Sequence, residues 1–77
     1  SAKTTSDTVE DYLEETISKN PNIKSLEINV VDTIKVEQLS GWSAYVVKIN
    51  AVLKKDNRNI KQKMIWFSDG KVITKEL

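Results

Sequence analysis

The hydrophobic pattern of this chain changes its period once, at Asn20-Pro21, and this change limits the folds that it can adopt. Before the proline, apolar residues recur three and four positions apart, as on one face of a helix. This face consists of Val9, Tyr12, Leu13 and Ile17. Because the residue before a proline disfavours the helical conformation, we expect a helix from Ser6 to Lys19 that ends there. After the proline, apolar and polar residues alternate, which indicates strands with a buried face.

Acidic residues gather in the first turns of the predicted helix. We expect Asp7 to cap the helix N-terminus and Glu10 to complete a D-x-x-E capping pattern, where the helix dipole also favours negative charge. The carboxylates of Glu10, Asp11, Glu14 and Glu15 all lie off the apolar face. The sequence contains neither histidine nor cysteine for a catalytic dyad, so a solvated helix surface explains these carboxylates.

Three strands are predicted between the helix and the last turn. The first, from Leu26 to Val36, is interrupted near Asp32, where we expect a bend or a bulge. The second runs from Trp42 to Leu53, and a charged tip separates it from the third, from Ile60 to Phe67. The second strand has apolar residues on both faces, so we expect a helix to cover one face and a second subunit the other.

The Asp69-Gly70 pair predicts a two-residue type I′ turn, because both central residues of that turn need positive φ. A last short strand then begins at Val72. Helix followed by four sequential strands predicts an α+β fold, in which the N-terminal helix packs on a curved four-stranded antiparallel meander sheet. At 77 residues, the chain is expected to form a single domain, 1–77.

Composition excludes several classes of function. Without cysteine or histidine, the chain has no ligands for the common zinc sites and cannot form a Ser-His-Asp or Cys-His arrangement. A net charge of +1 and a pI near 7.9 differ from the strongly basic character of nucleic-acid-binding domains. No apolar stretch approaches the length of a membrane span. We therefore expect no catalytic residues, no metal or other cofactor, and neither a nucleic acid nor a membrane as partner.

Three local features suggest binding or catalysis. Gln38-Leu39-Ser40-Gly41 superficially resembles the Q-x-V-x-G loop of cystatins, but it is one residue short and lacks the valine, so a simple turn is expected. Trp42 and Trp66 are candidate cleft or rim residues of a stand-alone cystatin-like or nuclear-transport-factor-like module that holds a peptide or an apolar ligand between helix and sheet. An enzyme of this general shape would need a polar residue inside its cavity, and Asp32 and Gln62 are too isolated to predict one.

The segment from Met64 to Ile73 resembles the strand, Asp-Gly-Lys turn and strand that end the N-terminal domain of DsbC/DsbG-type thiol:disulfide interchange proteins. The segments Ser18–Lys24 and Gly41–Tyr45 are similar to the same group. The resemblance implies a non-catalytic, cystatin-like dimerisation domain in the periplasm, excised from a longer chain whose C-terminal thioredoxin-fold domain carries a Cys-x-x-Cys pair.

The resemblance also implies a homodimer through the last strand, which positions two thioredoxin-fold domains around a cleft for misfolded client proteins. In the parent protein, this arrangement would serve disulfide isomerase, oxidoreductase or chaperone activity. Matching the Asp-Gly-Lys turn places the dimer interface at five consecutive residues. These are Val72, Ile73, Thr74, Lys75 and Glu76.

Overall fold

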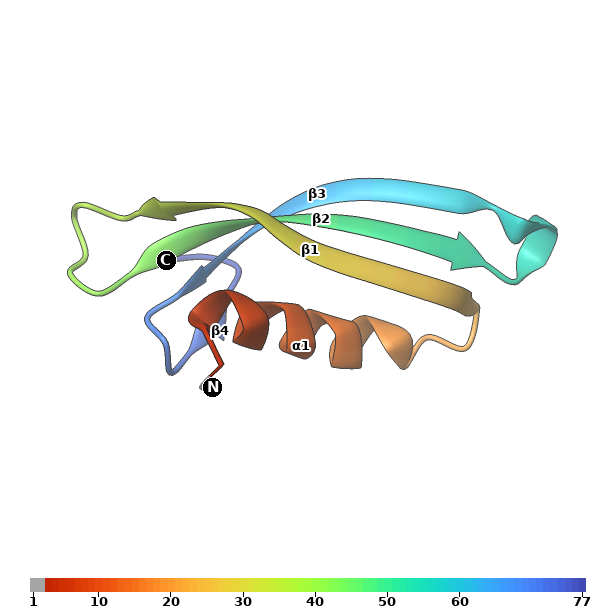
Figure 1. Cartoon of the computed structure of the whole chain (residues 1–77), viewed down its shortest axis with the longest axis horizontal. Coiled ribbons are helices and arrows are strands. Elements are labelled where there is room, and N and C mark those ends of the chain that lie inside the picture. The colour runs from red at the N-terminus through yellow and green to blue at the C-terminus, as the bar shows by residue number, and fades with distance from the viewer. Residues whose placement is uncertain (1–2) are drawn as a thin grey trace.

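A computed structural model describes residues 3–77 as one helix followed by a four-stranded sheet (Figure 1). The strands pair in chain order, and each is antiparallel to its neighbour. This confirms the predicted α+β fold with an N-terminal helix on an antiparallel meander. The elements are α1 (Thr5–Ser18), β1 (Ile23–Lys35), β2 (Ser43–Leu53), the 3-10 turn η1 (Lys55–Asn57), β3 (Asn59–Ser68) and β4 (Ile73–Thr74).

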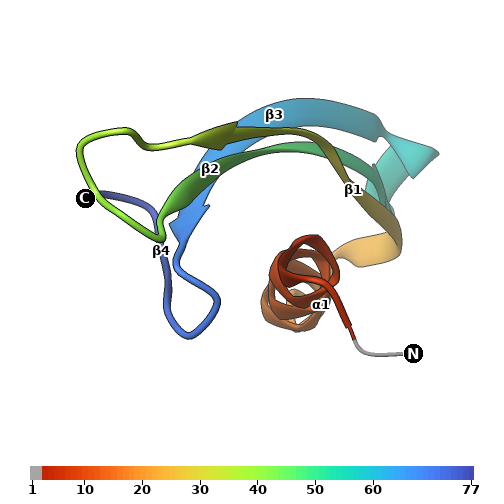
Figure 2. The ribbon, with the colours of Figure 1, turned by 60° about the vertical axis from the view of Figure 1, so that its left-hand side comes forward.

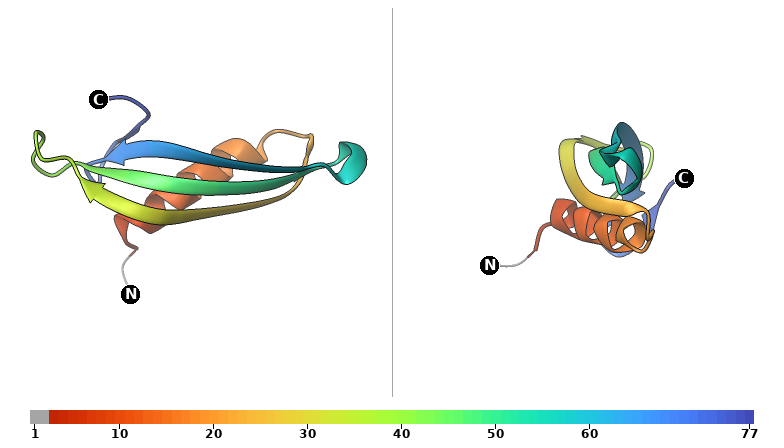
Figure 3. Two further views of the ribbon diagram at one scale, coloured as in Figure 1. Left: turned by 90° about the horizontal axis from the view of Figure 1, so that it is seen from above. Right: turned by 90° about the vertical axis from the view of Figure 1, so that its right-hand side faces the viewer.

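The sheet curves over α1, which lies on its concave side (Figure 2). Figure 3 shows from above that the helix crosses the strands obliquely. Val9 and Leu13 of α1 are buried against the inner face of β2 and form the core with it. The predicted apolar face of β2 supplies the other half of this core, as Tyr45, Val47, Ile49 and Ala51.

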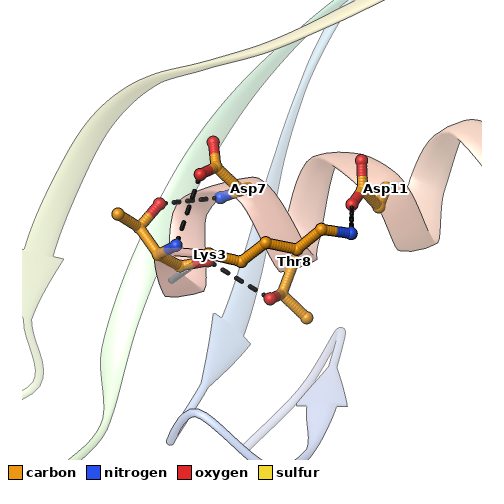
Figure 4. Close-up of polar contacts among 5 residues, drawn as sticks. Lys3, Asp7, Thr8 and Asp11 are labelled. Atoms are coloured by element: carbon orange, nitrogen blue, oxygen red, sulfur yellow. Dashed lines mark hydrogen bonds and ion pairs between the residues drawn. The ribbon is translucent and has the colours of Figure 1, made fainter. Parts of the chain in front are cut away.

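The helix begins at a different cap from the one that the sequence suggested. Thr4 is the N-cap: its hydroxyl accepts a hydrogen bond from the Asp7 N–H at 3.1 Å, and the Asp7 carboxylate accepts one from the Thr4 N–H (Figure 4). The predicted cap at Asp7 with Glu10 is therefore wrong by one turn. A threonine three residues before an acidic residue satisfies the same capping box, and it extends the helix to Thr5.

The predicted interruption of β1 is a bulge. Val30 pairs with Val47 whereas Asp32 pairs with Val46, so Val31 is an extra residue in β1. Because side chains alternate between the faces of a strand, one extra residue reverses the alternation beyond it. Ile34 therefore pairs with Ala44 and lies on the outer face of the sheet, away from α1.

The predicted type I′ turn at Asp69-Gly70 is wrong. Ser68 pairs with Ile73, so four residues form the loop, and of the Asp69-Gly70 pair only Gly70 has positive φ, at 96°. Side chains stabilise the wider loop: Ser68 Oγ accepts from the Gly70 N–H, and Asp69 Oδ1 accepts from the N–H groups of Lys71 and Val72. The left-handed pair stands instead at the other tip, at Asp56 and Asn57.

Candidate functional site

An apolar cleft lies between α1 and the inner face of β2 and β3. The helix packs mainly against β1, which leaves part of the inner face uncovered. The cleft has a volume of about 370 Å³, and none of its lining residues is charged. Leu13 and Ile17 of α1 form one wall, while Ile60, Met64 and Trp66 of β3 form the opposite one.

Trp66 is fixed at the wall of the cleft by an aromatic contact with Tyr12 of α1. The two ring centroids lie 6.0 Å apart with an interplanar angle of 70°, the edge-to-face geometry that aromatic pairs favour. The indole Nε1 is buried and has no hydrogen-bond partner among residues 3–77. Since an indole N–H usually finds an acceptor when it is buried, the ring is held by packing.

Trp42 belongs to a different surface. It lines a second depression, of about 380 Å³, together with Lys35, Glu37 and Gly41 at the turn between β1 and β2. Trp66 is absent from this lining, and Trp42 is absent from that of the cleft. The structure thus places Trp66 in the cleft beside α1 and does not bring the two tryptophans to one ligand.

The sheet has a free edge along most of β3. The strand β4 pairs only with Phe67 and Ser68, so within residues 3–77 no strand pairs with the outer edge of 59–66. The Leu53 N–H donates to the Arg58 carbonyl at the start of the hairpin. Hydrogen-bonded pairs then alternate along the strands, which directs the backbone groups of every second residue outward. These residues are Asn59, Lys61, Lys63 and Ile65.

The opposite edge, along β1, is protected. The Glu10 carboxylate accepts a hydrogen bond from the Val30 N–H at 2.7 Å, immediately before the bulge. A second register irregularity lies between Ile23 and Ser25. Bulges and an occupied donor are devices that discourage a further strand from pairing. Residue patterns do not reveal this contact, because Glu10 was expected on the solvated surface of the helix and Val30 lies twenty positions away in the chain.

Positive charge concentrates on the outer face beside the free edge. Lys48 of β2 lies directly opposite Lys63 of β3, and Lys61 lies two residues away on the same face. All three side chains are exposed, and none forms an ion pair with an acidic residue of segment 3–77. Like charges at directly opposed positions destabilise an antiparallel pair. A negative group beside Lys63 would relieve this repulsion.

The ion pair that the structure contains is at the start of α1, between Lys3 and Asp11 (Figure 4). The hydrogen bond that the Lys3 ammonium group donates to the Asp11 carboxylate raises the pKa of Lys3. Both side chains are largely exposed, so this pair contributes little to stability.

The outer face is apolar at its other end, near β4. Ile34, Ala44 and Phe67 form one row across three strands, and Val46 and Ile65 stand in the next row. We name these five residues the outer patch. Ile34 is 53% exposed and Ile65 is 52% exposed, so no part of residues 3–77 covers the patch fully. This agrees with the expectation that the second face of β2 is partly apolar, since Ala44 and Val46 share it with Lys48.

The predicted dimer strand is shorter than the motif suggested. Only Ile73 and Thr74 are paired with β3, and Val72 lies in the loop with 53% of its side chain exposed. Ile73 packs against the core, whereas Lys75 and Glu76 are exposed. The Thr74 hydroxyl donates to the Glu76 carbonyl, and the backbone bends at Lys75.

Residues 3–77 present neither a metal-binding cluster nor a membrane-spanning helix. Among residues 3–77, no group of three or more histidine, cysteine, aspartate or glutamate side chains is placed to hold a metal ion. No helix in this range has the length and apolar character needed to cross a bilayer. No family model, curated protein or solved structure matches this chain.

Proposed function

We propose that this chain is a non-catalytic homodimerisation domain of a periplasmic thiol:disulfide interchange protein of the DsbC/DsbG kind. The observation that carries the dimer is the outer edge of β4, with which no strand of residues 3–77 pairs. This edge adjoins the outer patch and the exposed side chain of Val72. Large exposed apolar side chains that adjoin one another are typical of protein–protein contacts.

A second copy is a suitable occupant of this end of the sheet. Pairing of two β4 segments about a two-fold axis extends both sheets and closes as a dimer, because the same surface is used by both copies. The segment that contributes is Val72 to Glu76, as the resemblance implies, with β4 at its centre. In the parent protein, the dimer would hold two redox domains at a fixed separation around a misfolded client, so that both engage one substrate.

The assignment to the disulfide family rests on the resemblance of Met64–Ile73 together with the α+β architecture. The chain has no cysteine, so any redox chemistry belongs to another domain of the parent protein. The role of this domain is then to associate, and the experiment below tests association directly.

Analytical ultracentrifugation at micromolar concentration tests the proposal with two matched variants. Val72→Glu adds a charge beside β4 and is expected to convert the dimer into a monomer. Val31→Glu makes the same change at a side chain of nearly equal exposure, 52%, on the far edge of the sheet, and should leave the dimer intact. The proposal is refuted if the wild-type chain is still a monomer at about 100 µM, roughly the highest concentration of such an experiment. It is also refuted if the two variants dissociate equally.

A further inference from the structure

The cleft and the free β3 edge are adjacent and together form a strand-binding site. Ile60, Met64 and Trp66 line the cleft from β3, while the backbone groups of Lys61 and Lys63 point outward along the same strand. We infer that this edge binds an extended peptide in which apolar and acidic residues alternate, added to the sheet as a strand beside β3.

Backbone geometry favours an extended chain over a compact ligand. Residues 59–66 are eight consecutive positions without a partner on one side, about 27 Å of strand at about 3.4 Å per residue. This edge lacks the protections of the β1 edge, since the pairing of β2 with β3 has no register shift. Strand addition at such an edge gains main-chain hydrogen bonds, and the side chains then determine specificity.

The alternation of the peptide follows from the two faces of β3. Residues of an added strand that stand opposite Gln62 and Met64 share their face, so their side chains enter the uncharged cleft. Residues opposite Lys61 and Lys63 lie on the outer face beside exposed ammonium groups. A carboxylate there relieves the repulsion between Lys48 and Lys63. Apolar residues inward and acidic residues outward therefore complement this site.

The same charges disfavour a second copy of this chain at the β3 edge. If two β3 strands pair antiparallel with Gln62 of one copy opposite Gln62 of the other, Lys61 of each copy lies opposite Lys63 of the other copy. Two pairs of like charges are then in direct opposition. Like charges at directly opposed positions oppose such pairing. The lysine row thus acts against self-pairing and in favour of an acidic partner, while the dimer proposed above uses β4.

The test measures the affinity of a fluorescein-labelled peptide of eight residues, with alternating valine and glutamate, by fluorescence anisotropy. Lys63→Ala removes one charge and keeps the backbone N–H, whereas Lys63→Pro removes the charge and the outward N–H. A proline at an outward position of an edge strand leaves the bonds to β2 in place. We expect Lys63→Pro to bind at least about tenfold more weakly than Lys63→Ala, the effect of losing one hydrogen bond with good geometry.

Modified peptides provide a second measurement on the wild-type protein, which remains decisive if the proline variant does not fold. N-methylation of the amides that face β3 should abolish binding, and methylation of the alternate amides should not. Replacing glutamate by lysine in the peptide should also abolish it. In a Trp42→Phe variant, the fluorescence of Trp66 should change on binding, because only Trp66 lines the cleft.

Several results would overturn the inference. Equal affinity of the Lys63→Pro and Lys63→Ala variants, or of the two methylated peptides, shows that the ligand does not pair as a strand. Displacement of the peptide by a small apolar molecule, together with insensitivity to both changes, assigns the cleft to an apolar ligand. Loss of the protein dimer in Lys63→Pro assigns the edge to a second copy. Absence of binding at millimolar peptide removes the site altogether.

Discussion

The contact between Glu10 and Val30 predicts a measurable loss of stability in Glu10→Ala. The variant leaves the Val30 N–H without its carboxylate acceptor at 2.7 Å, beside the bulge in β1. A hydrogen bond to a charged group contributes about 1.5–3 kcal/mol. Because Glu10 is only half-buried, water can replace part of the bond, so we expect about 1.5 kcal/mol of lost unfolding free energy.

This loss corresponds to a clear shift of the melting temperature. At about 2.1 cal/mol/K per residue, the entropy of unfolding of 77 residues is about 0.16 kcal/mol/K, so 1.5 kcal/mol lowers the Tm by about 9 °C. Urea unfolding followed by tryptophan fluorescence and thermal unfolding followed by circular dichroism measure the two quantities independently. Hydrogen exchange of the Val30 amide reports on the bond itself.

Glu14→Ala is the matched control, because Glu14 is exposed on the same helix and the substitution has the same effect on helix propensity. It should change stability by no more than a few tenths of a kcal/mol. Glu10→Gln retains a neutral acceptor and should lie between the two. Equal stability of Glu10→Ala and Glu14→Ala, with unchanged exchange at Val30, would show that the carboxylate does not hold this edge.

Other predictions concern the core and the last loop. Leu13→Ala should lower the unfolding free energy by about 3 kcal/mol, since the side chain is 98% buried, and a loss below 1 kcal/mol in urea titrations would contradict the packing. Gly70→Ala should cost about 1–2 kcal/mol through its φ of 96°, and an unchanged Tm would argue against that backbone conformation. Hydrogen bonds from the Val72 and Lys71 N–H groups lower the pKa of Asp69. The stabilisation is therefore present above the ordinary aspartate pKa and is lost as pH falls through the lowered value; an NMR titration with an ordinary midpoint would refute this.

The sequence was sufficient for the order and type of the elements, because their apolar periods differ and Pro21 separates them. It was not sufficient to predict on which face of the sheet the residues after the β1 bulge lie. Leu26 and Ile34 have the same parity, but the extra residue Val31 puts Ile34 on the outer face. Parity in a sequence predicts a face only while the register is unbroken.

The last loop shows a second limit of sequence patterns. An Asp-Gly pair favours a two-residue turn when nothing else competes for the backbone donors. Here the Ser68 and Asp69 side chains accept three of them, which stabilises a four-residue loop and shortens β4. Side-chain competition of this kind depends on local geometry, which pairwise sequence signals do not contain.

The candidate site was predictable only in part. Trp66 was a candidate cleft or rim residue, and it lines the cleft. The outward row of Lys61 and Lys63 is visible once β3 is in place, because Gln62 and Met64 occupy the opposite face. The free edge was not predictable, because it arises from the brevity of β4 and not from any residue of β3.

The shortness of β4 would also let one sheet edge serve both of the partners proposed above. If β4 extended along all of β3, it would satisfy the outward backbone groups of Lys61 and Lys63 and block access to the cleft. Because it pairs with Phe67 and Ser68 alone, a dimer built on β4 leaves residues 59–66 exposed in both copies. Dimerisation and peptide binding should therefore be independent: Val72→Glu should abolish the dimer without changing peptide affinity, and Lys63→Pro should do the reverse. If either variant loses both the dimer and the affinity for the peptide, then dimerisation and peptide binding use the same surface.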